Sequence, residues 1–253
     1  MAVYMRFCEC ESVPLLSANV DDVRLFVADQ LEHHARATAM NRLLAVRSFF
    51  RYLVARDVRP DDPTAAIPIR RDVLEPQRPY TVGELRRLLA ATESLVEKAM
   101  LLFAIGSGAR RSEMMAVDLA DVDWIDGTVL LRRAKGGRER KVAPGREAMK
   151  ALCRYVEGRC SGPVWVTECG RQMGGQDAYR MLQRIARRAG VVGATMHRIR
   201  VTMICGLLEA GADAISVSVV AGHSLEMVQH YQRATESKRA LAVQARLSLA
   251  DRL

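Results

Sequence analysis

The sequence predicts a mainly α-helical protein with a small antiparallel β-sheet, organised as two domains. Apolar residues recur at helical spacing through most of the 253 residues, and one stretch near the middle has strand and turn character instead. A basic run that contains Pro76 and Pro79 interrupts the helical pattern, because proline breaks helices and stiffens extended chain. We therefore expect a helical N-terminal domain at 1–72, a linker at 73–79 and an α+β domain at 80–253.

Two amphipathic helices are expected in the N-terminal domain. Apolar residues follow one another there at intervals of three and four, which places them on one face of a helix. The first face consists of Val23, Phe26, Val27 and Leu31, and the second of Leu43, Val46, Phe50 and Leu53. The two faces should pack against each other.

The second of these helices is also rich in arginine. It carries Arg42, Arg47, Arg51 and Arg56. Two interpretations are open, a solvated helix face or a surface that contacts DNA phosphate, because arginine serves both purposes in a basic chain.

The larger domain begins with a helix signal. Thr81 and Glu84 have the spacing of a capping box and precede an apolar face. Further helices are expected at about 95–105, from Asp177 to Gly190, from Thr195 to Gly211, as two short helices divided by Gly222, and in a helix-compatible segment from Ser237 to Leu253.

Between these helices the pattern changes to short strands. Turn sequences occur at Asp126-Gly127 and at Lys135-Gly136-Gly137, and strand-forming residues flank them from Trp124 to Val142. We expect three antiparallel strands here, with Lys135 at the tip of the second hairpin.

The composition points to a nucleic-acid partner. Lys plus Arg number 38 and Asp plus Glu 29, so the net charge is +9, which favours a polyanion. No window approaches the roughly 20 apolar residues of a membrane span, and the first ten residues lack a secretory pattern. We expect a cytoplasmic protein that binds no membrane.

Six cysteines are scattered without a paired CxxC spacing. They are Cys8, Cys10, Cys153, Cys160, Cys169 and Cys205. This argues against a zinc ribbon and fits free thiols. We expect no metal ion and no cofactor.

Six reactive residues stand in short motifs along the larger domain. They are Arg110 in GARRSE, Lys135 in RAKGGRER, His197 and Arg200 in HRIR, His223 in AGHS, and Tyr231 in QHYQ. Taken singly, each motif is short enough to occur by accident, and each residue has a structural explanation. Their joint occurrence in this order is the stronger signal.

These motifs, in this order, resemble the catalytic domain of the tyrosine recombinases of the phage integrase family. The N-terminal segment RSFFRYLVARDVRPDDPTAAI resembles the core-binding domain of that family. The resemblance implies a helical core-binding domain, a catalytic α+β domain, and site-specific DNA recombination or integration of a mobile element. It also implies double-stranded DNA as partner, with a dimer on each site and a tetramer in the synapse.

The chemistry of the six residues fits this activity. Arg110 and Arg200 can hold the non-bridging oxygens of a phosphodiester, and His197 and His223 can donate hydrogen bonds to the same group. Tyr231 is the expected nucleophile, giving a 3′-phosphotyrosine that keeps the bond energy for religation, so no ATP is needed. Lys135 is the expected general acid for the departing 5′ oxygen. Because arginines supply the positive charge, no divalent ion is required.

The sequence departs from the family pattern at three places. Val201 follows Arg200 where the family often has histidine. His223 and Tyr231 are eight residues apart instead of nine, a difference of about 100° on a regular helix unless the turn is shortened. Little of the family's first helix is expected before Asn19. Glu113 is expected to be structural, orienting Arg110 or the helix that follows.

Two other functions remain open from the sequence. One is a DNA-binding protein of recombinase ancestry that does not cleave. The other is an enzyme like the type IB topoisomerases, which share this chemistry without site specificity. Beyond Tyr231, the apolar positions of the tail are expected to dock on either its own domain or a neighbouring protomer.

Overall fold

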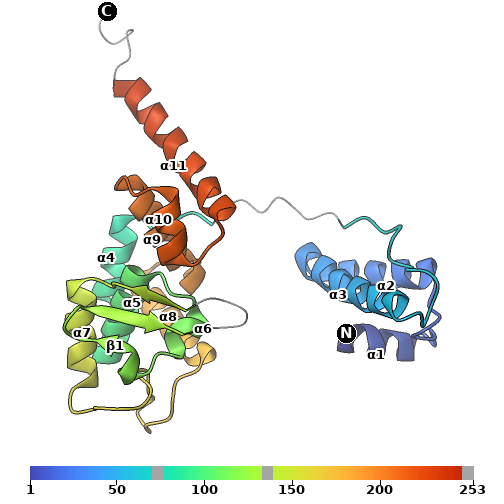
Figure 1. Ribbon diagram of the computed structural model, residues 1–253, viewed down its shortest axis with the longest axis horizontal. Helices are drawn as coiled ribbons and strands as arrows, with labels where there is room; N and C mark the ends of the chain where they lie inside the picture. The colour runs from blue at the N-terminus through green and yellow to red at the C-terminus, as the bar shows by residue number, and fades with distance from the viewer. Residues whose placement is uncertain (70–76, 133–138, 247–253) are drawn as a thin grey trace, which may run out of the picture. The chain divides into compact units, whose positions relative to one another are not determined.

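The computed structural model describes residues 1–69, 77–132 and 139–246 of the chain. The chain divides into two compact units, Met1–Pro76 and Gln77–Leu253, called here the N-terminal and C-terminal units (Figure 1). The described residues are mainly helical and contain one three-stranded antiparallel sheet, as the sequence predicts. None of the helices in these ranges has the length and apolar character that crossing a bilayer would need. Part of the predicted linker, 73–76, lies outside the described residues.

Three helices form the N-terminal unit: α1 (Ala2–Cys10), α2 (Val20–His33) and α3 (Arg36–Ala55). The two predicted amphipathic helices are confirmed as α2 and α3. Helix α1, nine residues long and placed before Asn19, was not predicted as a separate element. Its Tyr4 ring packs edge-on against Phe26 of α2, with the ring centroids 4.9 Å apart. Aromatic packing of this kind holds the short helix on the core.

The arginines of α3 have different surroundings. Arg47 donates to the hydroxyl and carbonyl oxygens of Thr64 at 3.2 and 2.7 Å and also to the carbonyl of Ile67. Its guanidinium therefore supports the chain that follows α3. Arg51 and Arg56 are exposed.

The core of the C-terminal unit is helical. It is built by α4 (Val82–Ala90), α5 (Leu95–Ser107), α6 (Arg111–Met115), α7 (Arg146–Val156) and α8 (Gly175–Ala189). Helix α5 lies at the centre, where it contacts α4, α7 and α8. Gly106 in α5 lies so close to the chain of Pro144 that a β-carbon there would be 1.8 Å from the Pro144 carbonyl oxygen. Only glycine permits this approach.

The capping predictions are confirmed, but one helix was missed. Thr81 and Glu84 form a reciprocal capping box at the start of α4, and Gly190 ends α8 in the left-handed conformation. Helix α7 was not predicted, although Ala148, Leu152 and Val156 give it a buried face at helical spacing.

The sheet has the order β1-β2-β3, with β1 (Val122–Asp123), β2 (Thr128–Leu131) and β3 (Arg140–Val142). Val129 pairs with Val122 on one side and with Val142 on the other. Three antiparallel strands were predicted and are present, but the first ends at Asp123 and so lies before the predicted start at Trp124. The predicted second turn, with Lys135, falls on residues 133–138 and lies outside the described residues.

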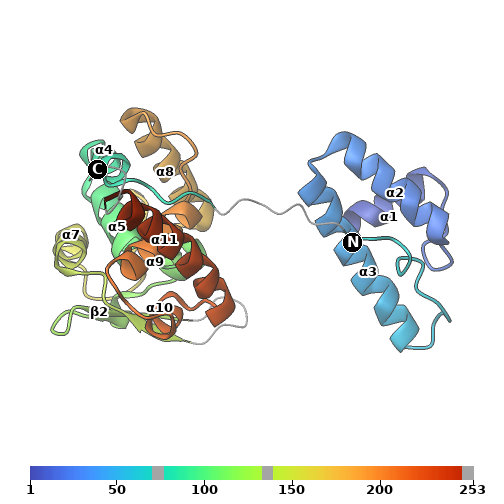
Figure 2. The same cartoon turned by 90° about the horizontal axis from the view of Figure 1, so that it is seen from above.

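Three helices complete the unit: α9 (Met196–Glu209), α10 (Ala214–Ala221) and α11 (Leu225–Arg246). They lie together at one end of the unit, and α11 crosses α9 when seen from above (Figures 1 and 2). The predicted break between a short helix and the segment from Ser237 is wrong, because α11 is continuous to Arg246. The stretch has no proline or glycine that would interrupt it.

Candidate active site

Four of the six predicted residues line one pocket of about 370 Å³ in the C-terminal unit. They come from separate parts of the sequence: the start of α6, the first turns of α9 and the turn after α10. The pocket is lined by Ala109, Arg110, Arg111, Tyr179, Thr195, Met196, His197, Arg200 and His223. The fold therefore brings two arginines and two histidines to one cavity.

Arg200 is the most buried member of this group, with 2% of its surface exposed. Its guanidinium donates to the Gly108 carbonyl at 2.6 Å, to the Ala221 carbonyl, and through Nε to Nε2 of His223 at 3.1 Å. Burial, and then the charges of Arg110 and Arg140, lower the pKa of Arg200 to about 10. The side chain stays positively charged at neutral pH and is held rigidly.

Arg110 is more exposed, and Glu113 holds it. The Glu113 carboxylate accepts from the Arg110 backbone N–H at 2.8 Å and from Nη1 at 2.7 Å, while Nη2 donates to the Gly222 carbonyl at 2.6 Å. With 42% of its side chain exposed, Arg110 can still meet a ligand from solvent. The contacts support the predicted structural role of Glu113.

A third arginine, Arg140 of β3, completes this network. Its Nη1 and Nη2 donate to the two carboxylate oxygens of Glu113 at 3.0 and 2.8 Å, and its Nε donates to the Val220 carbonyl at 2.9 Å. Arg140 was not among the six residues predicted from the sequence motifs. The available signal was its position as the last residue of RAKGGRER, the motif that contains Lys135. In the structure its side chain is nearly buried in spite of its charge.

The three arginines share the C-terminal end of α10. The carbonyls of Val220, Ala221 and Gly222 are consecutive and accept from Arg140, Arg200 and Arg110 respectively. Carbonyls at a helix C-terminus lack partners within the helix and carry partial negative charge, so they attract cations. This helix end thereby gathers three positive charges beside the pocket.

The two histidines are neutral at pH 7. Burial, followed by the charges of Arg200 and Arg110, lowers the pKa of His223 to about 4. Because Nε2 of His223 accepts a hydrogen bond from Arg200, the ring proton is placed on Nδ1. Burial and the charge of Arg200 also lower the pKa of His197. Neutral rings beside arginines can donate a hydrogen bond to an anion without adding repulsion.

Tyr231 lies near this group but outside the pocket lining. It is 6% exposed and packs in a hydrophobic cluster with Ile204, Cys205 and Val228. Burial and the neighbouring Cys205 raise its pKa, whereas the charge of Arg200 lowers it. Since α11 starts at Leu225, only Ser224 separates His223 from the helix. Tyr231 lies close enough to Arg200 for their charges to interact.

Two other tyrosines are rivals as nucleophiles. Tyr155 is occupied, because its hydroxyl donates to the Val166 carbonyl at 3.1 Å and accepts from the Val166 N–H at 3.0 Å. Tyr179 lines the pocket and is 41% exposed. It is therefore the rival that an experiment has to exclude.

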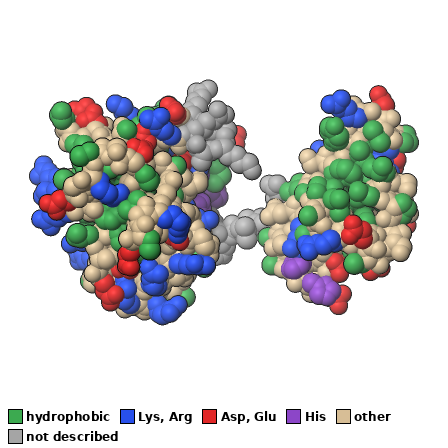
Figure 3. Space-filling view, turned by 90° about the horizontal axis from the view of Figure 1, so that it is seen from below, with side chains coloured by type: hydrophobic (Ala, Val, Ile, Leu, Met, Phe, Trp, Pro, Cys, Tyr) green, Lys and Arg blue, Asp and Glu red, His purple; other side chains and the backbone are tan. Residues whose placement is uncertain are grey.

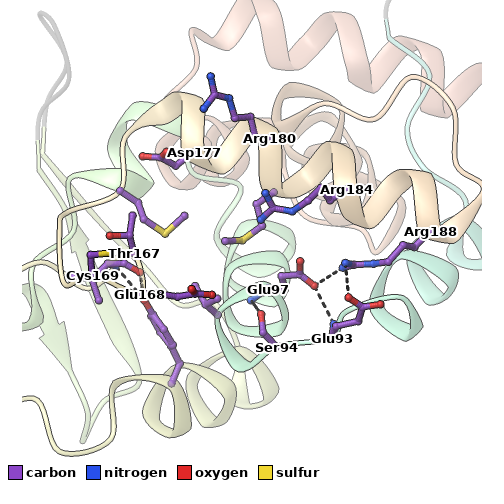
Figure 4. A pocket seen from close by; sticks show the side chains of 15 residues that line it. Glu93, Ser94, Glu97, Thr167, Glu168, Cys169, Asp177, Arg180, Arg184 and Arg188 are labelled. Atoms are coloured by element: carbon purple, nitrogen blue, oxygen red, sulfur yellow. Dashed lines mark hydrogen bonds and ion pairs between the residues drawn. The ribbon is translucent and has the colours of Figure 1, made fainter.

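A larger cavity of the unit is elsewhere, between α5, α8 and the 166–173 loop (Figure 4). Its volume is about 770 Å³. Arg188 crosses one end and pairs with Glu93 at 2.7 Å and with Glu97, while Glu168 lies on the opposite loop. Both positive and negative side chains therefore line this cavity, and none of the six predicted residues is among them.

Within the described ranges, no cluster of three or more His, Cys, Asp or Glu side chains could hold a metal ion. None of the six cysteines, all within these ranges, forms a disulfide, and Cys8 and Cys205 are buried.

A buried arginine cluster beside a tyrosine, on a helical unit with a three-stranded sheet, defines a candidate phosphodiester-binding site. The family model described as the phage integrase family matches residues 80–238. This range is more than half of the chain and spans the whole pocket. The chain therefore belongs to the phage integrase family, the tyrosine recombinases.

Two curated relatives illustrate the similarity. The chain is 32% identical over 215 residues to tyrosine recombinase XerD of Mycobacterium tuberculosis (strain ATCC 25618 / H37Rv), covering 74% of this chain and 66% of that protein. It is 29% identical over 243 residues to tyrosine recombinase XerC of Roseiflexus sp. (strain RS-1), covering 89% of this chain and 77% of that protein. Slightly less than two thirds of the mycobacterial protein is thus matched.

Solved structures share the fold. The Tn1549 transposon integrase in complex with circular intermediate DNA superposes with a TM-score of 0.72 at 19% identity, covering 86% of this chain and 82% of that one. A lambda integrase dimer bound to a core site gives 0.73 at 16% identity, covering 91% and 87%. At these identities the likeness establishes the fold.

Proposed function

We propose that the protein is a site-specific DNA recombinase that cleaves a DNA strand with Tyr231 and rejoins it without metal or ATP. The observation that carries this proposal is the convergence of Arg110, His197, Arg200 and His223 on one pocket next to Tyr231. Its relatives are tyrosine recombinases, so strand breaking and rejoining is the activity that family membership supports.

The pocket is suited to a phosphodiester. Arg110 and Arg200 present guanidinium groups that can share the non-bridging oxygens, and the neutral His223 adds a donor through Nδ1–H. These groups are held by bonds to Glu113 and to the end of α10 before any substrate arrives. Preorganised positive charge of this kind stabilises the pentavalent transition state without reorganisation during the reaction.

Tyr231 acts as nucleophile at the phosphorus, forming a 3′-phosphotyrosine and releasing the 5′ oxygen. Its raised pKa keeps the phenol protonated in the resting protein, so its proton is lost only on attack, next to Arg200. Lys135, outside the described residues, is the general acid of this proposal and protonates the departing 5′ oxygen. Religation reverses these steps with another 5′ hydroxyl.

The N-terminal unit is proposed as the core-binding domain, with residues 1–72 contacting DNA and 73–79 linking it to the catalytic domain. Lys and Arg side chains are prominent on the face of the C-terminal unit seen in Figure 3. The partner is double-stranded DNA in the cytoplasm, bound by a dimer at each site and a tetramer in the synapse. The compact size of the chain and its separate helical N-terminal unit favour site-specific action over that of a type IB topoisomerase.

The decisive experiment is to incubate the protein with DNA from the flanks of its own gene and to separate the products on a denaturing gel. The wild type should form a covalent protein–DNA adduct that persists in excess EDTA. Tyr231→Phe should form none while binding DNA with nearly unchanged affinity, because only the phenolic oxygen is lost.

Tyr179→Phe is the matched control, because Tyr179 is exposed in the same pocket. This variant should form the adduct as the wild type does. An adduct that survives in Tyr231→Phe and disappears in Tyr179→Phe would reassign the nucleophile. DNA binding without any adduct in the wild type would favour the non-cleaving alternative.

A further inference from the structure

Arg140 is not among the residues assigned to the reaction, yet it is bonded to two parts of the site. All three of its nitrogens donate within the protein, to Glu113 and to Val220, at 2.8–3.0 Å. Its side chain is 9% exposed, and it does not line the pocket. Arg140 is therefore placed to act on the site through other residues.

The first connection runs through Glu113. Oε1 of this carboxylate accepts from both Arg110 and Arg140, and Oε2 accepts from the Arg110 backbone and from Arg140. Burial raises the pKa of Glu113, but hydrogen bonds from Arg140 and then from Arg110 lower it to about 2. The carboxylate is thus fixed in one orientation, and that orientation fixes Arg110.

The second connection runs through the end of α10. Arg140 holds the Val220 carbonyl, two residues before the Gly222 carbonyl that binds Arg110. Its guanidinium also covers Gly222, where a β-carbon would lie 3.0 Å from Nη1 and 3.1 Å from Cζ. His223 follows immediately, so Arg140 packs on the turn that leads to α11.

We propose that Arg140 is a positioning residue for strand cleavage. It orients the Glu113 carboxylate that directs Arg110, and it anchors the end of α10 just before His223. The inference rests on the proposed function. Through Arg140, strand β3 is joined to the phosphate-binding group, so the sheet becomes part of the support of the site.

The test compares Arg140→Met on two substrates in single-turnover cleavage. One has an ordinary phosphodiester at the cleaved position, and the other a methylphosphonate, which is neutral and needs less positive charge. If Arg140 acts by aiming Arg110, Arg140→Met should cleave the phosphodiester roughly 10- to 100-fold more slowly, with a much smaller loss on the methylphosphonate. A variant that is merely misfolded would lose equally on both substrates.

Three further variants sharpen the test. Lys141→Met changes the exposed neighbour on β3 and should cleave both substrates like the wild type. Arg140→Lys keeps the charge but not the paired bonds to Glu113, and should recover only part of the rate. In the Arg110→Ala background, adding Arg140→Met should slow cleavage by no more than about threefold, because residues that act as a unit are not additive.

The outcomes separate the two proposals. A wild type that cleaves, with Arg140→Met either unimpaired or impaired equally on both substrates, would overturn the positioning role alone. A wild type that forms no adduct would overturn the proposed function itself. Melting curves of each variant show whether it is folded.

Discussion

His223 illustrates how the surroundings of a single residue determine its chemistry. The sequence places this histidine just before the helix that carries Tyr231, but it does not determine the protonation state of the ring. In the structure, Arg200 donates to its Nε2, and burial with two nearby arginines lowers its pKa to about 4. A neutral ring follows from this contact. A charged ring would repel the arginines that the phosphate requires.

The expected outcome is a histidine that does not titrate near neutrality. In the free protein, NMR signals of His223 should stay constant from pH 8 to about 5 and change only near pH 4. The lowered pKa of His223 also makes the free energy of unfolding depend on pH. The contribution of the neutral ring to this free energy is fully present above about pH 6.5 and is lost as the pH falls towards 4, because the histidine of the unfolded chain takes up its proton at the higher pH.

His33 provides an internal control for this measurement. It is exposed, and a hydrogen bond to the Asp29 carbonyl raises its pKa above the ordinary value of 6.5. Its signals should therefore titrate above that pH in the same spectra. Bound DNA should move the pKa of His223 upward, since a phosphate favours the charged ring. A His223 that titrates beside His33 in the free protein would contradict the described contacts.

At the scale of elements, the end of α10 is the main organising feature. A short helix ends at Gly222, and its last carbonyls bind three arginines that come from β3, α9 and the start of α6. The same turn leads into the helix that carries Tyr231. The placement of the three arginines and of Tyr231, the proposed nucleophile, thus depends on one helix terminus.

A pair of glycine substitutions separates helix termination from site support. Gly222 and Gly190 each end a helix with φ of +62°. Alanine should therefore cost about 1–2 kcal/mol of stability at either position. Only at Gly222 would the new β-carbon press on Arg140, so Gly222→Ala should also lose cleavage activity, whereas Gly190→Ala should keep it. Melting curves and adduct yields, measured side by side, check both parts. Equal activity in the two variants would argue against this crowding.

The sequence predicted elements where one local signal was sufficient. Thr81 with Glu84, and Gly190 after α8, are local capping signals, and both were confirmed. The bonds of Arg140 could not be predicted in this way, because Glu113 and Val220 are 27 and 80 residues away in the sequence. The sequence motifs identified residues of the pocket. The protonation states of these residues, and the hydrogen bonds that hold them, could be seen only in the three-dimensional contacts.

At the scale of the whole molecule, the positive charge has two different uses. Some arginines stabilise the fold, as Arg47 does by bonding to Thr64 and to Ile67. Others remain exposed on α3, where Arg51 is 3.7 Å from Asp62 and Arg56 lies over the Tyr52 ring at 5.6 Å. From the sequence alone, all of them had the same two interpretations. The net charge of +9 is therefore not a count of DNA contacts.

The salt dependence of DNA binding distinguishes these uses. If Arg51 and Arg56 contact phosphate, replacing both with glutamine should reduce the slope of log K against log salt by about 1.8, which is roughly 0.9 for each lost contact. Arg47→Gln should leave the slope unchanged and lower the melting temperature instead, because its bonds lie within the N-terminal unit.

Arg24→Gln on α2, which changes an exposed arginine paired with Asp21, controls for the general loss of charge. Binding curves at several salt concentrations give the slopes. If the slope is unchanged in the double variant, Arg51 and Arg56 belong to a solvated face. If Arg24→Gln reduces the slope by as much as the double variant does, the effect is only that of a lower net charge.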